Sequence, residues 1–153
     1  MAHNQSYPPA YPDHFTYYHP ITVRYADLDP QQHVNNAAVV TYLESARMGY
    51  YQASGIWDGK SFDQFGMMVA AMHIDYLKPI TFGQSVRVGQ LVSHMGTKSI
   101  RFRFQIEDAN SGHALARGEV VMVAYDPISE KSIPIPTDWR EKIAKFENFG
   151  EDK

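Results

Sequence analysis

Residues 24–36 read RYADLDPQQHVNN, and a long amphipathic segment follows them. The pattern predicts the end of a strand, a polar loop with two carboxylates, and the start of a helix. Asp29-Pro30 interrupts the strand, because proline has no N–H group to donate to a sheet. Asn35 and Asn36 offer side-chain oxygens that can cap the free N–H groups of a helix. We therefore expect a carboxylate on a loop just ahead of a helix N-terminus.

The segment behind this loop has the periodicity of a helix with one buried face. Val39, Leu43, Ala46 and Tyr50 recur at helical spacing. Gly55 stands where the end of a helix favours a residue with positive φ. One long helix is therefore predicted between the polar loop and this glycine.

A carboxylate ahead of a helix N-terminus suits acyl transfer. The free N–H groups and the positive end of the helix dipole stabilise negative charge that develops on a carbonyl oxygen. The carboxylate can serve as a nucleophile or as a base that activates water. Asp and Asn are also common in turns for purely local reasons. From spacing alone, a capped loop without chemistry therefore remains an open alternative.

The pattern RYxDLDxxxHVNN resembles the signature of hotdog-fold acyl-CoA thioesterases of the 4-hydroxybenzoyl-CoA thioesterase type. The similarity continues through residues 42–47 and 77–80 to about Tyr125, and so covers most of the chain. It implies an α+β hotdog fold, in which an antiparallel sheet of five or six strands wraps around one long central helix. It also implies hydrolysis of an acyl-CoA thioester to the free acid and coenzyme A. Gln32 departs from the pattern, because the family usually has glycine before the histidine.

The resemblance assigns roles to several residues of the loop. Asp29 aligns with the family's nucleophile or general base, and Asn36 with the position whose backbone N–H polarises the thioester carbonyl. Asp27 would then orient the loop. In an extended segment the two carboxylates point the same way, so their repulsion is expected to raise one pKa. His33 either makes a structural hydrogen bond or pairs with Asp29, as in hotdog hydratases.

The phosphates of coenzyme A need cationic partners. Lys98 and Arg101, with Ser99 between them, are the candidates for this substrate-binding role, since Lys and Arg commonly bind phosphate. The alternative is that they form the solvated face of a strand. We expect the acyl pocket to be lined largely by methionine, whose flexible side chain adapts to ligands of different shape. The alternative is that these methionines belong to the hydrophobic core. The expected wall residues are Tyr42, Met67, Met68 and Met72.

Further strands are predicted at residues 19–25, 66–77, 85–93, 98–107 and 113–125, the last four as a meander. The continuous apolar run at 66–72 predicts a strand buried on both faces, and Gly89 a bulge. The strand at 98–107 has an apolar face of Ile100, Phe102, Phe104 and Ile106. A final helix is expected up to Asn148, capped by Thr137 or Asp138. The predicted organisation is an extension at 1–18, a hotdog domain at 19–136, and a helix with a tail at 137–153.

Composition limits the remaining function classes. The chain has 153 residues, 44% of them hydrophobic, a net charge of −3 and no cysteine. This is typical of one soluble domain, with no electrostatic footprint for nucleic acid or an anionic membrane. We expect a cytoplasmic enzyme without metal or cofactor, apart from the coenzyme A of its substrate. Edge strands that need pairing predict a homodimer or homotetramer. A hotdog hydratase or dehydratase and a non-catalytic acyl-CoA-binding module are the alternatives.

Overall fold

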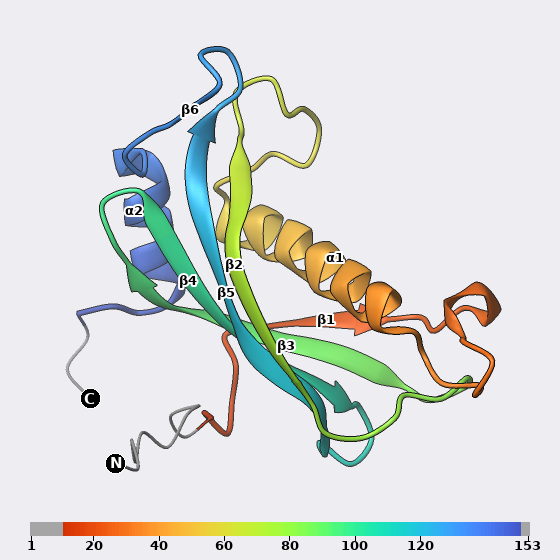
Figure 1. Cartoon of the computed structure of the whole chain (residues 1–153). Coiled ribbons are helices and arrows are strands. Elements are labelled where there is room, and N and C mark those ends of the chain that lie inside the picture. The colour runs from red at the N-terminus through yellow and green to blue at the C-terminus, as the bar shows by residue number, and fades with distance from the viewer. Residues whose placement is uncertain (1–10, 151–153) are drawn as a thin grey trace, which may run out of the picture.

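The computed structural model describes residues 11–150 and shows an antiparallel sheet with two α-helices (Figure 1). The order in space is β1-β3-β4-β5-β2, and β6 pairs with β5. The elements are β1 (Tyr17–Ile21), the 3-10 turn η1 (Tyr25–Asp27), α1 (Asn36–Ser54), β2 (Met67–Tyr76), β3 (Val86–Met95), β4 (Ser99–Asp108), β5 (Ala114–Asp126), β6 (Lys131–Ser132) and α2 (Thr137–Phe146). The expected α+β hotdog architecture is confirmed.

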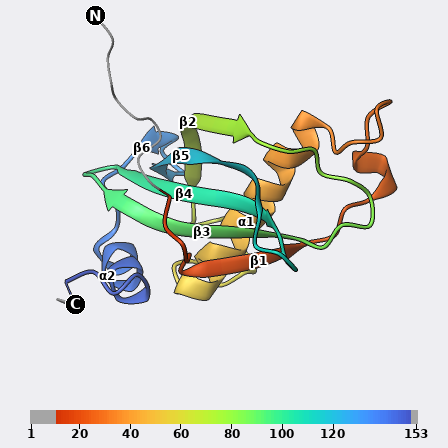
Figure 2. The ribbon, with the colours of Figure 1, turned by 90° about the horizontal axis from the view of Figure 1, so that it is seen from below.

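Helix α1 lies across one face of the curved sheet (Figures 1 and 2). The Asn35 side chain caps it by accepting a hydrogen bond from the Ala37 N–H at 2.8 Å. Gly55 ends it in the left-handed conformation with φ of 85°. The predicted apolar stripe from Val39 to Tyr50 is buried. The sequence pattern therefore placed both ends and the buried face of this helix correctly.

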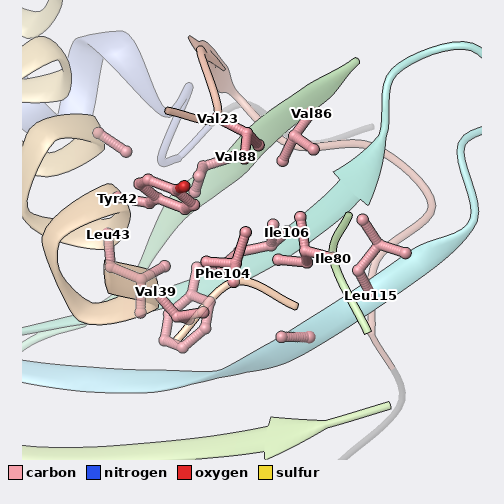
Figure 3. Close-up of a cluster of buried hydrophobic side chains, with 13 residues drawn as sticks. Val23, Val39, Tyr42, Leu43, Ile80, Val86, Val88, Phe104, Ile106 and Leu115 are labelled. Atoms are coloured by element: carbon pink, nitrogen blue, oxygen red, sulfur yellow. The ribbon is translucent and has the colours of Figure 1, made fainter. Parts of the chain in front are cut away.

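The core divides into two clusters along α1. Under its first half, Val39 and Leu43 pack with Val88, Phe104 and Ile106 (Figure 3). Under its second half, another cluster joins the helix to β4, β5 and α2. Each fully buried aliphatic or aromatic side chain contributes about 1.5–3 kcal/mol of transfer free energy. The four predicted inward residues of β4 are all buried, so the alternation of that strand is confirmed.

Strand β2 corrects the prediction of a strand buried on both faces. Among residues 11–150, it pairs with β5 alone and forms an edge of the sheet. Met68 is 51% exposed and Val69 is 49% exposed. The continuous apolar residues of β2 therefore belong to an exposed edge strand and not to a strand that is covered on both faces. The meander expectation also changes, because only β3, β4 and β5 follow one another across the sheet.

Other predicted boundaries also shift. The first strand begins at Tyr17 and ends at Ile21, well before Asp29-Pro30, so the proline does not end it. The expected bulge at Gly89 is absent from the described residues, where the register of β3 and β4 shifts instead between Val92 and His94. A Cβ at Gly89 would approach the Phe15 ring to 2.7 Å, so this glycine permits close packing of that ring.

The C-terminal helix packs beyond the end of α1. Its N-cap position is Pro136, without a side-chain cap, so the expected capping by Thr137 or Asp138 is wrong. Glu147 follows the helix and accepts hydrogen bonds from Tyr50 Oη at 2.5 Å and Val92 N at 2.8 Å. These contacts fasten α2 to α1 and β3. Among the described residues, no helix is long and apolar enough to span a membrane.

Candidate active site

The loop between β1 and α1 is built around Asp27. Its carboxylate accepts hydrogen bonds from Arg24 Nη2 at 2.8 Å, Arg24 N at 2.9 Å and Tyr42 Oη at 2.7 Å. Burial disfavours the charge, but the hydrogen bonds from Arg24 and Tyr42 outweigh it and lower the Asp27 pKa to about 2. The backbone carbonyl also accepts from Asn35 N at 2.8 Å. Asp27 therefore ties the loop to both neighbouring segments.

The expected repulsion between the two carboxylates is absent at Asp27, whose pKa is lowered rather than raised. The hydrogen bonds from Arg24 and Tyr42 account for the lowered pKa, and residues 25–27 form a 3-10 turn rather than the extended segment on which the expectation rested. The buried Asp27 carboxylate already accepts hydrogen bonds from Arg24 and Tyr42. The loop-orienting role suggested for it agrees with these contacts.

Asp29 lies two residues further on and is only partly buried. Its Oδ1 accepts hydrogen bonds from Gln31 N at 2.9 Å and His33 N at 3.3 Å. Within residues 11–150, no donor contacts Oδ2. Asp29 thus has one oxygen that is held by the backbone and one that remains available for chemistry.

Gln32 adopts the backbone conformation that glycine would favour. Its φ is 63°, in the left-handed region. The turn closes through Gln32 N to Asp29 O at 2.9 Å and Asp29 N to His33 O at 2.8 Å. The loop therefore keeps its tight path despite the departure from the family pattern, at a cost of about 1–2 kcal/mol for a left-handed non-glycine residue.

The N-terminus of α1 supplies a free donor. The Asn35 cap satisfies Ala37 N, and Val39 N donates to Asn35 O. In the part of the chain that the structure describes, Asn36 N has no backbone or side-chain acceptor. Such first-turn N–H groups attract developing negative charge. The Asn36 side chain is not the cap, so its backbone N–H is what this position offers.

The structure brings the three expected catalytic positions together. Asp29, His33 and Asn36 line one hollow of about 300 Å³ between the start of α1 and the end of β2. His33 contacts Asp29 through its backbone N–H, and its imidazole makes no hydrogen bond to the described residues. The hollow is therefore lined by a carboxylate, a residue at the start of α1 with a free backbone N–H, and a nearby imidazole.

The three expected phosphate contacts lie elsewhere in the protomer. Ser99 pairs with Val123, whereas Ala116, which lines the hollow of Asp29, pairs with Ile106. These positions are seven residues apart on β4, or about 23 Å along a strand. Lys98, Ser99 and Arg101 thus occupy the opposite end of the sheet from Asp29, and Lys98 Nζ contacts Ser132 Oγ at 3.3 Å.

Lys78 is a cation that the sequence analysis overlooked. It is exposed and lines the hollow of Asp29. Its signal was present in the Leu-Lys-Pro-Ile segment that extended the family resemblance. Only the antiparallel placement of β2 against β5 carries this segment to the start of α1.

A second, more apolar hollow of about 450 Å³ opens further along α1, against β2. Met67 and Met68 line it, as expected for walls of an acyl pocket. Met72 packs against the core instead. Tyr42 is buried, and its hydroxyl binds Asp27, so its assignment as a pocket wall is wrong.

Comparison with known proteins identifies the family. Residues 23–143 match the model of the thioesterase-like superfamily. A thioesterase from Thermus thermophilus, solved in complex with coenzyme A and Zn, is 34% identical, with a TM-score of 0.76 over 88% of this chain and 96% of its own. This chain belongs to the thioesterase-like superfamily. The expectation of a hotdog thioesterase, and hence of an enzyme, is confirmed.

Two other members of the comparison extend this result. The long-chain acyl-CoA thioesterase FadM of Escherichia coli is 25% identical over 126 residues, covering 82% of this chain and 96% of its own length. A 1,4-dihydroxy-2-naphthoyl-CoA thioesterase from Synechocystis shares the fold, with a TM-score of 0.73, 19% identity and coverage of 83% and 94% of the two chains. Among residues 11–150 of this superfamily member, no group of three His, Cys, Asp or Glu side chains is placed to hold a metal ion.

Proposed function

We propose that this protein hydrolyses acyl-CoA thioesters in the hollow between α1 and the end of β2. The observation that carries the proposal is that the same hollow is lined by Asp29 and by Asn36, whose backbone N–H has no acceptor among the described residues. A reacting carbonyl between them would meet a carboxylate oxygen on one side and an oxyanion donor on the other. The superfamily membership and the similarity to an acyl-CoA thioesterase support this substrate class.

Two routes use these groups. In the first, Asp29 Oδ2 attacks the thioester carbon, and the resulting oxyanion accepts a hydrogen bond from the Asn36 N–H. Collapse of this intermediate expels the coenzyme A thiolate and leaves an anhydride, which water then cleaves. In the second, Asp29 removes a proton from water, and the hydroxide adds to the same carbon before the thiolate leaves. Hydrolysis in heavy-oxygen water distinguishes them, because only the first route can transfer label into the Asp29 carboxylate.

We also propose that two protomers pair through the free edge of β2. Apolar side chains at this edge are half exposed, and a long open edge strand invites pairing. Antiparallel pairing about a two-fold axis would place the Lys98 end of one sheet on the same side as the Asp29 hollow of the other. Lys78 within the hollow and Lys98 or Arg101 across the interface are then the phosphate partners that we propose.

The hydratase alternative finds less support in the contacts of the loop. A hydratase pair would use the imidazole, but Asp29 and His33 meet through the His33 backbone N–H. The same contact holds the Asp29 carboxylate in place, which agrees with the structural interpretation of this histidine.

The decisive experiment is thiol release from short-chain, long-chain and aromatic acyl-CoAs by the wild type, Asp29→Asn and Asp63→Asn. We expect Asp29→Asn to lower kcat by about 10³-fold, within the range for loss of a positioned acid or base. The exposed Asp63 lies in the loop before β2, away from the hollow of Asp29, and serves as a control for the same chemical change. Full activity in Asp29→Asn would overturn the catalytic assignment, and no release by the folded wild type would overturn the proposed function.

A further inference from the structure

Arg47 is an arginine in the interior of the protein. It lies on α1 and is 4% exposed, yet within residues 11–150 its Nη1 has no hydrogen-bond partner. A buried charge without a partner costs several kcal/mol, so such residues are ordinarily paired. Glu44 lies one turn earlier on the helix, but the described residues contain no ion pair between the two. Among residues 11–150, Arg47 therefore has no ion-pair partner and one buried N–H group without an acceptor.

Tyr51 lies one turn after Arg47 and is a second buried residue with an unsatisfied polar atom. Its side chain is buried, and its hydroxyl makes no hydrogen bond of good geometry among the described residues, although Arg47 lies close enough to lower its pKa. Burial raises the pKa of Tyr51 by more than the neighbouring Arg47 cation lowers it, so the phenol keeps its proton and remains a donor. Two adjacent side chains, one cationic and both donors, thus lack an anionic acceptor.

Both side chains line the apolar hollow between α1 and β2. Its other walls are largely methionine and aromatic residues, namely Met48, Phe62, Phe65, Met67, Met68 and Met122. Glu44 also lines it but is exposed, so its charge is screened by water. An apolar hollow lined by two buried donors fits a ligand that is aliphatic along its length and carries an anionic acceptor at its tip.

The position of this hollow relates it to the proposed reaction. Asn36 and Arg47 are eleven residues apart on α1, which corresponds to about 16 Å along a helix. An extended aliphatic chain covers about 1.2 Å per bond, so the span corresponds to a long acyl chain of about a dozen bonds. Both hollows lie along α1 and are lined by residues of β2, and they share no lining residue. A chain that reaches from the reacting carbonyl to the buried donors would run along the helix between them.

We propose that Arg47, assisted by Tyr51, selects long-chain acyl-CoAs that carry a second carboxylate at the far end of the acyl chain. This proposal rests on the thioesterase function proposed above and names its substrate class. The guanidinium offers two parallel N–H groups to the distal carboxylate, and the tyrosine hydroxyl a third donor. An acyl chain with a methyl end would leave the buried charge unpaired and would therefore bind less well.

The test compares plain long-chain acyl-CoAs with their ω-carboxy counterparts of equal length, for the wild type, Arg47→Met, Arg47→Lys, Tyr51→Phe and the control Lys142→Met. Lys142 is an exposed cation on α2, outside the hollow. We expect the wild type to have at least tenfold higher kcat/KM for the ω-carboxy substrate. Arg47→Met should abolish this preference, and Tyr51→Phe should reduce it a few-fold. Arg47→Lys should keep part of it, and Lys142→Met all of it.

Two further measurements keep the outcomes distinct. Binding of both acyl-CoAs to Asp29→Asn, followed by calorimetry, tests the preference without turnover, so an inactive enzyme would refute the thioesterase function alone. Arg47→Met should also raise Tm, because it removes an unpaired buried charge. Equal affinity of the wild type for the two substrates, or a preference that survives in Arg47→Met, would overturn the proposal. Dissociation of an oligomer by Arg47→Met with unchanged selectivity would assign Arg47 to an interface and would overturn it as well.

Discussion

Asp27 and Asp29 are two residues apart in one loop, and the structure uses them in opposite ways. Asp27 is 4% exposed and is bound by the side chains of Arg24 and Tyr42. Asp29 is partly exposed, is held through one oxygen by backbone donors, and faces a hollow at the start of α1. The comparison shows that a carboxylate with its hydrogen bonds satisfied builds the loop, whereas its less satisfied neighbour is available for chemistry.

The largest effect on stability should follow from loss of the Asp27 charge. Asp27→Asn weakens its hydrogen bonds to Arg24 and Tyr42, and bonds to charged groups contribute about 1.5–3 kcal/mol each. We expect the free energy of unfolding to fall by about 3 kcal/mol, measured by urea denaturation. Asp29→Asn alters a partly exposed side chain and should change the free energy of unfolding by less than about 0.5 kcal/mol. Equal destabilisation by the two variants would remove the distinction between them.

The same contrast predicts a dependence of stability on pH. The folded-state pKa of Asp27 is about 2, below its ordinary value of 3.8, so the folded state favours the charged form. Its contribution is therefore fully present above about pH 4 and is lost as the pH falls from about 4 to 2. The difference in unfolding free energy between wild type and Asp27→Asn should shrink over this interval. A difference that stays constant from about pH 5 to about pH 2 would contradict the lowered pKa.

A smaller effect is expected from the partner of Asp27 on α1. Tyr42→Phe removes the 2.7 Å hydrogen bond but keeps the ring in the core. Removal of one hydrogen bond to a charged group should cost about 1.5 kcal/mol. Because this bond joins the loop to the helix, kcat should also fall modestly through displacement of Asp29. Tyr42→Phe should cost less in the Asp27→Asn background than in the wild type, and fully additive losses in the double variant would show that the Asp27 charge does not strengthen this bond.

The sequence predicted well those features that depend on local patterns. Spacing alone located α1 with its Asn35 cap and Gly55 end, and the inward face of β4. The resemblance placed Asp29 and Asn36 in one site. Local patterns did not reveal that β2 is an exposed edge, because a continuous apolar run looks the same whether a neighbouring strand covers it or not. Nor did they separate Tyr42 from the pocket walls, since its bond to Asp27 spans fifteen residues.

Long-range placement also decides where the candidate cations lie within one protomer. Lys98 and Arg101 were chosen for their charge on the clearest strand, but the register of β4 with β5 carries them away from Asp29. Lys78 reaches the site because β2 runs antiparallel to β5 and ends beside α1. Likewise, only the folded structure shows that the Arg47 side chain is buried and that, among residues 11–150, its Nη1 has no hydrogen-bond partner.

The smallest effect in the loop concerns Gln32, whose backbone has φ of 63°. Gln32→Gly should relieve the cost of the left-handed conformation, about 1–2 kcal/mol, but should lose part of that gain to the greater freedom of glycine in the unfolded chain. We expect a net gain of about 0.5–1 kcal/mol in urea denaturation. Gln32→Ala, which keeps a Cβ in the same conformation, is the matched control and should give no such gain.

The same variant also tests whether the strained turn serves the chemistry. The turn positions the backbone donors to Asp29 but not those to Asp27, so kcat of Gln32→Gly reports on the reactive side of the loop alone. An unchanged kcat with higher stability would show that the strain is incidental. A lower kcat would show that the conformation of Gln32 holds Asp29 in its reactive position, because the added freedom of glycine would then loosen the carboxylate that faces the hollow.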